Sequence, residues 1–100
     1  MGTRAGTVTN VLFVWDPRKA AANVRKHGVG FREAATALED PLSTTFSDEA
    51  HPGDEQRFIT IGMSSQSRLL VVAHTETAKM IRVISARRAT RRERLFYEED

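Results

Sequence analysis

The chain has 100 residues, no cysteine and a formal net charge of +2, with an isoelectric point near 9.5. Its length is that of one domain, and the lack of cysteine excludes disulfides and cysteine-ligated zinc sites. No apolar run approaches the roughly 20 residues of a membrane span, and the N-terminal region has no signal-peptide pattern. We therefore expect a cytoplasmic protein that does not contact a membrane.

The first predicted elements are a lead-in, a short strand and a helix. Residues 1–10 are small and polar, and we expect a flexible segment that precedes one domain over residues 11–100. The apolar run VLFVW that opens the domain is typical of a strand. Asp16 and Pro17 then indicate an N-cap and a first helical position, and Gly28 indicates a left-handed C-cap.

Two short helices are predicted in succession. The first is expected to bury one apolar face, made of Ala20, Ala21 and Val24. The second has apolar residues at the helical spacing i, i+3, i+4 and i+7, namely Phe31, Ala34, Ala35 and Leu38. Two short helices of this kind form a hairpin that must bury its apolar stripe against a larger element.

From residue 43 onward the apolar pattern becomes that of β-strands. The β-rich runs RFITIGM, RLLVVAH and KMIRVIS are joined by short connections, which predicts antiparallel neighbours. STTFS is a weaker edge-strand candidate, and DEAHPGDEQ is an acidic loop. Thr90 and Glu93 form a capping box for a final helix. The order predicts an α+β fold, with a helical hairpin packed on a mainly antiparallel sheet of about four strands, plus a short N-terminal strand and a short C-terminal helix.

The segment RVISARRATRRER, residues 82–94, is the most distinctive in the chain. Three of its arginines, Arg91, Arg92 and Arg94, fall in the predicted first turn of the last helix. There the helix dipole disfavours each cation by roughly 0.3–1 kcal/mol. Helix stability does not explain this placement, whereas an external anion, such as a nucleic-acid backbone or an acidic partner surface, does.

Two arginines of the predicted strands are candidates for binding a phosphate. Arg82 lies among apolar residues within the last predicted strand, and Arg68 opens the strand before it. An unpaired buried guanidinium is costly, so Arg82 must reach water, an acid or a phosphate. If both arginines lie on one open sheet face, they form a phosphate clamp, because a planar guanidinium binds two phosphate oxygens. A solvent-facing arginine on a one-sided sheet is an equally good interpretation of Arg82.

The histidines give weaker signals. Lys26 and His27 end the first helix, where a cation complements the dipole, so their position alone explains them. His74 ends a strand and His51 lies in the acidic loop, and each fits an acid–base role or that of an ordinary polar residue. No HxH, HExxH or EF-hand spacing occurs, so we expect neither a metal site nor a cofactor.

Acidic and aromatic side chains add two further candidates. The loop carboxylates are interpreted as solvated, with a carboxylate base as the lesser alternative: Asp48, Glu49, Asp54 and Glu55. Tyr97 is the one candidate for stacking on RNA bases, and a place in the core or a lid explains it at least as well.

Three stretches, FVWDPRKAAANVRKHGVGFREAATALEDPLS, DEQRFITIGMSSQSRLLVVAHTE and IRVISARRATRRERLFYEE, resemble the BrnT family of bacterial type II toxins. The elements WDP, KHGV, RFI and RVISAR stand in the family's order, and the likeness covers roughly residues 13–99. Gln56 stands directly before RFI, where the family often has an acidic residue, and Glu55 adjoins it.

The resemblance implies a RelE-like fold, a ribonuclease activity that halts translation, and neutralisation by a BrnA antitoxin with a ribbon-helix-helix DNA-binding part. Toxin and antitoxin of this family typically repress their own operon together, so operator DNA would be contacted only through the antitoxin. The alternative is a catalytically silent basic module that acts only through antitoxin docking and operon regulation. A generic RNA-binding domain is a third interpretation.

Metal-independent RNA cleavage proceeds by attack of the ribose 2′-hydroxyl on the adjacent phosphate, which requires proton transfer and stabilisation of a dianionic transition state. On this hypothesis Arg68, Arg82 and Arg87 hold the phosphate. Lys26 or His27 transfers a proton or stabilises charge. The remaining basic residues and the tyrosine are expected to bind RNA or antitoxin: Arg88, Arg91, Arg92, Arg94 and Tyr97.

Overall fold

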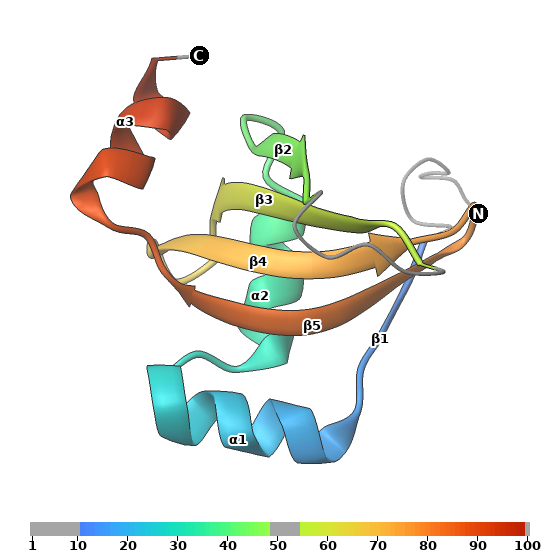
Figure 1. Cartoon of the computed structure of the whole chain (residues 1–100). Helices are drawn as coiled ribbons and strands as arrows, with labels where there is room; N and C mark the ends of the chain where they lie inside the picture. Colours follow the sequence, from blue (N-terminus) through green and yellow to red (C-terminus); the bar gives the residue numbers. More distant parts are fainter. Residues whose placement is uncertain (1–10, 49–54, 100) are drawn as a thin grey trace.

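A computed structural model describes residues 11–48 and 55–99, and in this part of the chain a five-stranded sheet is combined with three helices (Figure 1). The elements in chain order are β1 (Leu12–Val14), α1 (Pro17–His27), α2 (Phe31–Leu38), β2 (Thr44–Ser47), β3 (Arg57–Met63), β4 (Leu69–Glu76), β5 (Met80–Arg88) and α3 (Arg91–Glu98). This confirms the predicted order and the α+β class. The predicted lead-in lies outside the described residues, as do Glu49, His51 and Asp54.

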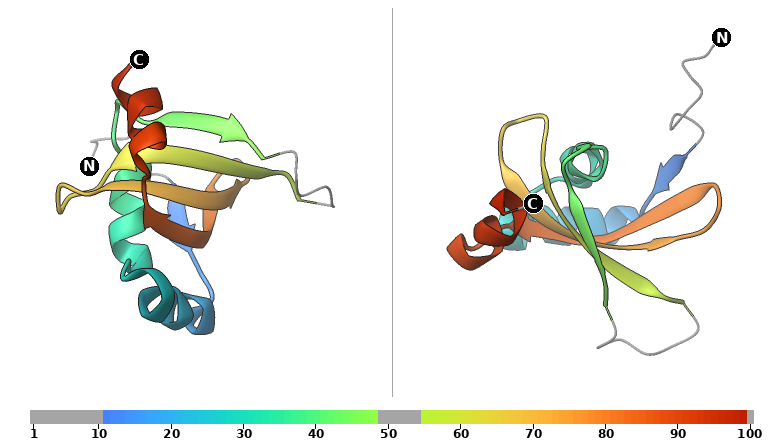
Figure 2. Two further views of the ribbon diagram at one scale, coloured as in Figure 1. Left: turned by 60° about the vertical axis from the view of Figure 1, so that its left-hand side comes forward. Right: turned by 90° about the horizontal axis from the view of Figure 1, so that it is seen from above.

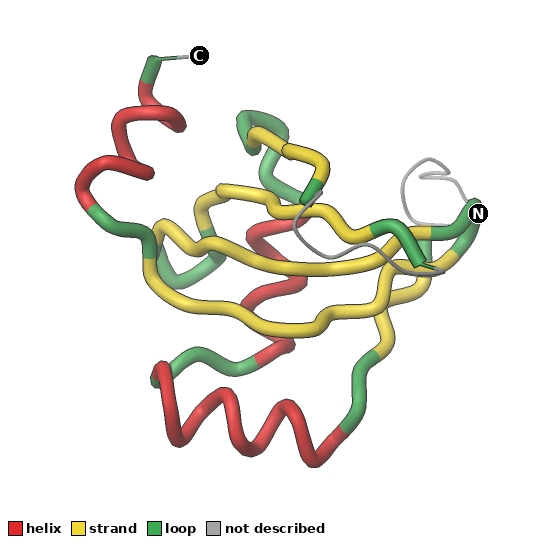
Figure 3. The backbone as a smooth tube through the Cα atoms, in the orientation of Figure 1, coloured by secondary structure: helices red, strands yellow, loops and turns green. Residues whose placement is uncertain are grey.

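The strands are arranged in the order β1-β5-β4-β3-β2. β1 runs parallel to β5, and the other neighbours are antiparallel. The helices α1 and α2 lie against one side of this sheet, whereas α3 stands at one end of the other side (Figure 2). We call these sides the covered face and the open face. The backbone path in Figure 3 shows that no helix of the described residues covers the centre of the open face.

The main core lies between α2 and the covered face. It consists of buried side chains from the α1–α2 connection, α2, β4 and β5: Val29, Phe31, Ala34, Ala37, Leu70, Val72, Val83 and Ala86. Trp15 closes one side of this core with its ring edge-on to Phe31, at a centroid distance of 6.2 Å. Gly62 of β3 permits the close approach of α2, because a Cβ atom there would lie 2.3 Å from the carbonyl oxygen of Ala37.

The helix α1 docks differently from the prediction. Of the expected apolar face, Ala20 packs against the main core, whereas Val24 is 50% exposed, and the residue that α1 buries is Asn23. The Asn23 side-chain amide donates to the carbonyls of Val29 and Ala86 at 2.9 and 2.8 Å, and its oxygen accepts from the Ala86 N–H at 3.1 Å. A period-based prediction misses this contact because it ranks residues by apolarity, whereas Asn23 pairs with backbone groups.

A bulge in β5 decides which face its arginines occupy. Between β4 and β5 the pairing jumps from Ser85 to Val83, so Ile84 is an extra residue of β5. In a regular strand Arg82 and Arg87 would point to opposite faces, because side chains alternate with a period of two. The extra residue brings both arginines to the open face.

The helix α3 is held at its start and near its end. Thr90 and Glu93 form the predicted capping box. Tyr97 donates a 2.6 Å hydrogen bond to Asp40, which also accepts from the Met63 N–H at 2.8 Å. Beneath α3 lies a smaller apolar cluster of Ile61, Leu69 and Val71.

Candidate functional site

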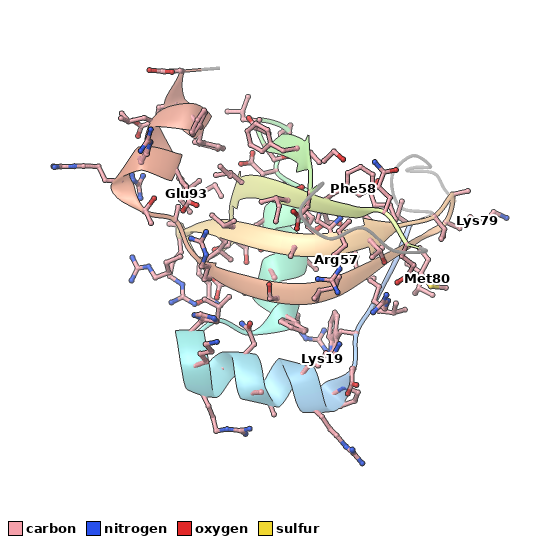
Figure 4. All side chains as sticks on the ribbon, in the orientation of Figure 1. Lys19, Arg57, Phe58, Lys79, Met80 and Glu93 are labelled. Atoms are coloured by element: carbon pink, nitrogen blue, oxygen red, sulfur yellow. The ribbon has the colours of Figure 1, made fainter. Side chains whose placement is uncertain are left out.

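Two arginines lie in one row across the open face. Arg57 of β3 pairs with Thr75 of β4, and Thr75 pairs with Arg82 of β5. Neighbouring strands lie about 4.8 Å apart, so the two arginine backbones are roughly 10 Å from each other with Thr75 between them. Figure 4 shows Arg57 over the centre of this face. Arg57 makes no ion pair with any residue in the described part of the chain, which leaves its guanidinium available to a ligand.

Arg82 contacts a carboxylate that the sequence did not link to it. Its guanidinium donates to Glu55, which directly precedes Gln56 at the start of β3. The two side chains are 40% and 58% exposed. An ion pair this open to water contributes little to stability, roughly 0–1 kcal/mol. A phosphate group can therefore replace Glu55 on the guanidinium at low cost.

Arg87 is held more firmly. Its two terminal nitrogens donate to the two carboxylate oxygens of Glu93 at 2.8 and 2.7 Å. This contact, more than the capping box, lowers the pKa of Glu93 to about 2. The pair joins the end of β5 to the start of α3, and Glu93 is labelled at this junction in Figure 4. It also lines a cleft of about 420 Å³, whose other walls are Phe46, Ile59, Ile61, Val71 and Phe96.

Arg68 does not share the open face with Arg82, which corrects the predicted two-arginine clamp. The Arg68 guanidinium lies on the helix-covered side of the sheet, where it donates to Glu33 of α2 at 2.9 and 2.5 Å and to the Gly28 carbonyl at 3.1 Å. This hydrogen bonding lowers the pKa of Glu33 despite its burial. Arg68 directly precedes β4, whereas Thr75, the residue that pairs with Arg82, lies near the other end of this strand. The backbones of Arg68 and Thr75 are therefore about 20 Å apart along the strand.

Lys26 and His27 belong with Arg68 rather than with Arg82. They form the last turn of α1 and directly precede Gly28, whose carbonyl accepts from Arg68. The predicted catalytic residues therefore fall into two groups on different sides of the sheet. The sequence could not separate the two groups, because their positions depend on the bulge in β5 and on the contacts of Arg68 with α2, which form only in the folded protein.

The residues predicted to bind RNA or antitoxin are also divided. Arg88 is paired with the core residue Leu70 and lies on the covered face, where its charge contributes to the lowered pKa of Glu33. The three arginines of α3 are exposed, namely Arg91, Arg92 and Arg94. A terminal nitrogen of Arg94 lies 3.9 Å from a carboxylate oxygen of Glu98. Tyr97 is occupied by its bond to Asp40, which with burial raises the tyrosine pKa to about 12.

His74 is buried on the covered face and cannot reach a substrate on the open face. Its Nε2 is 2.7 Å from the Thr60 hydroxyl, and burial lowers the pKa of His74 to about 4. The imidazole is therefore neutral at pH 7, and its 3.3 Å contact with Glu76 is not an ion pair there. Among the described residues, no group of three or more His, Asp or Glu side chains is arranged to hold a metal ion.

A family model described as the ribonuclease toxin BrnT of type II toxin–antitoxin systems matches residues 15–93. The chain belongs to this family. The 1.1 Å crystal structure of the Brucella abortus ribonuclease toxin BrnT has the same fold, with a TM-score of 0.62 over 81% of this chain and 99% of that chain at 23% identity. No curated protein sequence matches the chain.

The BrnT match includes all the open-face candidates that precede α3, as well as Glu93. Arg94 and Tyr97 of α3 lie beyond it. Membership of a type II ribonuclease toxin family implies an RNA substrate and an antitoxin partner. No helix within the described residues is long and apolar enough to span a membrane.

Proposed function

We propose that this BrnT-family chain is an endoribonuclease toxin that cleaves RNA on its open face without a metal ion. The observation that carries the proposal is the row formed by Arg57, Thr75 and Arg82, with the Glu55 carboxylate on the second guanidinium. It combines two guanidinium groups and a carboxylate on the open face, with the buried Thr75 side chain in the row between the two arginines. These are the groups that a phosphodiester transesterification requires.

The proposed reaction is attack of a ribose 2′-hydroxyl on the adjacent phosphorus. The O2′–P bond forms and the P–O5′ bond breaks, which gives a 2′,3′-cyclic phosphate and a 5′-hydroxyl end. One proton leaves O2′ and one is taken up by O5′, so no external reactant is needed. Arg82 and Arg57 stabilise the negative charge that grows on the equatorial oxygens.

Glu55 is the proposed acceptor of the 2′-hydroxyl proton. In the free protein its carboxylate is bound to Arg82. When a phosphodiester takes its place on Arg82, Glu55 is released beside the ribose that carries that phosphate. Substrate binding thus positions the base and binds the phosphate in one step. Lys26 and His27 are not assigned to proton transfer here, because they lie near Arg68 on the other side of the sheet.

The cellular role that fits this chemistry is inhibition of translation in the cytoplasm through RNA cleavage. The neutralising partner is proposed to be a BrnA-like ribbon-helix-helix antitoxin, and operator DNA is contacted only through that partner. No cofactor is required, because the chain's own side chains supply the charge stabilisation and the proton acceptor. Finding a neighbouring reading frame that encodes a ribbon-helix-helix protein would support this assignment.

Cleavage of a labelled RNA by purified protein in EDTA tests the proposal. The wild type is expected to cleave and to leave 2′,3′-cyclic phosphate ends, and Arg82→Ala to lose about 100-fold or more in rate. Arg32→Ala is the matched control, because Arg32 is an exposed arginine of α2, away from the open face. Cleavage that requires a divalent metal, or that is undiminished in Arg82→Ala, contradicts the proposed mechanism.

One observation favours a second function, that of a catalytically silent binding module. Both arginines that β5 places on the open face are already bound by carboxylates of the chain, Arg82 by Glu55 and Arg87 by Glu93. If the wild type cleaves no RNA and its expression does not arrest growth, antitoxin docking and operon regulation become the better explanation of the fold.

A further inference from the structure

The cleft beside α3 combines features that the cleavage mechanism does not use. Its walls are apolar side chains of β3 and β4 and two aromatic rings, and the Arg87–Glu93 pair lies at its edge. Its volume of about 420 Å³ falls within the range of small-molecule sites.

The two aromatic rings form a corner. Phe46 of β2 and Phe96 of α3 have centroids 6.0 Å apart and planes inclined by 75°. Their side chains remain 39% and 52% exposed, although both are large and apolar. A flat ring that stacks on one phenylalanine meets the other with its edge, and both contacts are favourable geometries for aromatic pairs.

This corner lies on the same face as the arginine row. Arg87 at the cleft is opposite Val71, and Arg82 is opposite Thr75, four residues further along β4. The separation is about 13 Å, a distance that a short piece of single-stranded nucleic acid spans. A polyanion held by Arg57 and Arg82 therefore passes close to the cleft.

We infer that the cleft binds an unstacked nucleobase of a single-stranded RNA whose backbone lies on Arg82. This inference rests on the proposed function and adds the form of the substrate. Bases of single-stranded RNA are commonly held by stacking on aromatic side chains. Arg87 and Glu93 present a donor and an acceptor at the cleft edge, which match the polar edge of a base rather than an aliphatic side chain.

The test pairs protein variants with modified RNA. Short 2′-O-methylated RNAs, which lack the attacking hydroxyl, carry an abasic residue at each position in turn, and their affinities are measured by fluorescence anisotropy. Phe96→Leu keeps an apolar side chain without a flat ring and is expected to weaken binding of intact RNA about 10-fold. An abasic residue at one position is expected to abolish this difference between Phe96→Leu and the wild type.

Two control variants separate stacking from damage to α3. Phe96→Tyr retains the ring and is expected to bind like the wild type. Leu95→Ala truncates a neighbouring α3 side chain that is 51% exposed and does not line the cleft, and it is expected to leave affinity unchanged.

Three results overturn the inference. One is equal binding by Phe96→Leu and the wild type, and another is a loss that no abasic position removes. The third is a loss of antitoxin binding alone, which would assign the cleft to the protein partner. Cleavage of unmodified RNA is scored separately. A protein that binds RNA through the cleft but does not cleave it contradicts only the proposed function. A protein that cleaves RNA although the Phe96→Leu effect does not depend on any one base contradicts only the inference.

Discussion

Two arginine–carboxylate pairs of the molecule have the same chemistry and different surroundings. Arg68 and Glu33 meet on the covered side of the sheet with side chains 26% and 5% exposed, and Ser64 donates a further hydrogen bond to Glu33 at 2.7 Å. Arg82 and Glu55 meet on the open face, where their side chains are 40% and 58% exposed. In the first pair the carboxylate is buried and the arginine is partly exposed, whereas both members of the second pair are open to solvent and can exchange with a ligand.

The difference shows that burial, more than residue type, separates an arginine held by the fold from one that a ligand can reach. Removing one partner of an enclosed pair leaves a charge without compensation. Removing one partner of an exposed pair leaves a charge that water solvates. Stability measurements should therefore respond to Arg68, and cleavage measurements to Arg82.

The largest stability effect is expected from Arg68→Met. The variant leaves the buried Glu33 carboxylate with Ser64 as its remaining side-chain partner, and we expect the free energy of unfolding to fall clearly more than in Arg82→Met. Arg82→Met is the matched control and should change it by less than about 0.5 kcal/mol. Urea denaturation measures both.

The double variant Arg68→Met with Glu33→Gln sharpens this result. It removes the isolated charge and should regain part of the lost stability, which a double-mutant cycle quantifies. Equal destabilisation by Arg68→Met and Arg82→Met would show that the two pairs do not differ as their exposure indicates.

A smaller effect is expected from pH, and it also belongs to the covered face. The pKa of His74 is about 4 in the folded protein and 6.5 ordinarily, so between these values the unfolded chain binds more protons. Stability is therefore complete above pH 6.5 and falls as the pH drops toward 4, by about 2 kcal/mol at pH 5.

His74→Gln provides the control for this pH effect. It removes the titrating group, so the difference in unfolding free energy between pH 7.5 and pH 5 should shrink. Glu93, with a pKa of about 2 against an ordinary 4.5, contributes only at lower pH. If His74→Gln has the same pH dependence as the wild type over this interval, another group is responsible.

A loss of about 1 kcal/mol is expected from Tyr97→Phe, which removes one hydrogen bond that docks α3. Asp40 keeps the N–H groups of Met63 and Leu42 as donors, so no carboxylate is left without partners. Hydrogen exchange of the α3 amides should accelerate while the amides of β4 on the covered side stay protected. Uniform acceleration would mean that α3 is not an independent unit of the open face.

Much of the fold was predictable from local signals. Asp16, Pro17 and Gly28 bound α1 as expected, because caps act within a few residues of the chain. The antiparallel pairing of β3, β4 and β5 followed from their short connections, whereas the parallel pairing of β1 with β5 did not. The docking of α1 through Asn23 was not predictable, because its partner groups on Ala86 lie 63 residues away.

The candidate site was predictable in part. The apolar setting of Arg82 predicted an arginine that must reach water, an acid or a phosphate, and in the structure its guanidinium contacts the acid Glu55 of the same chain. The sequence could not show that Arg57 joins the row, because its place depends on the β3–β4 register. It also could not show that Arg68 forms an ion pair with Glu33, since the two residues are 35 positions apart in the sequence.

The smallest expected effect concerns Arg92 at the start of α3, which belongs to neither of the two ion pairs compared above. This side chain is exposed and the N-terminal end of the helix dipole disfavours it, which we explain by long-range attraction of RNA. Arg92→Ala should weaken RNA binding about two- to threefold at low salt and lower the salt slope by at most about 0.7, the contribution of one phosphate contact on a single strand. At high salt the difference should vanish, because screening removes interactions between exposed charges. Arg82→Ala should retain its defect in the cleavage step at both salt concentrations, since a group that contacts the reacting phosphate acts at short range. A salt-independent defect in Arg92→Ala would place that residue in direct contact with the substrate and extend the reactive part of the open face to α3.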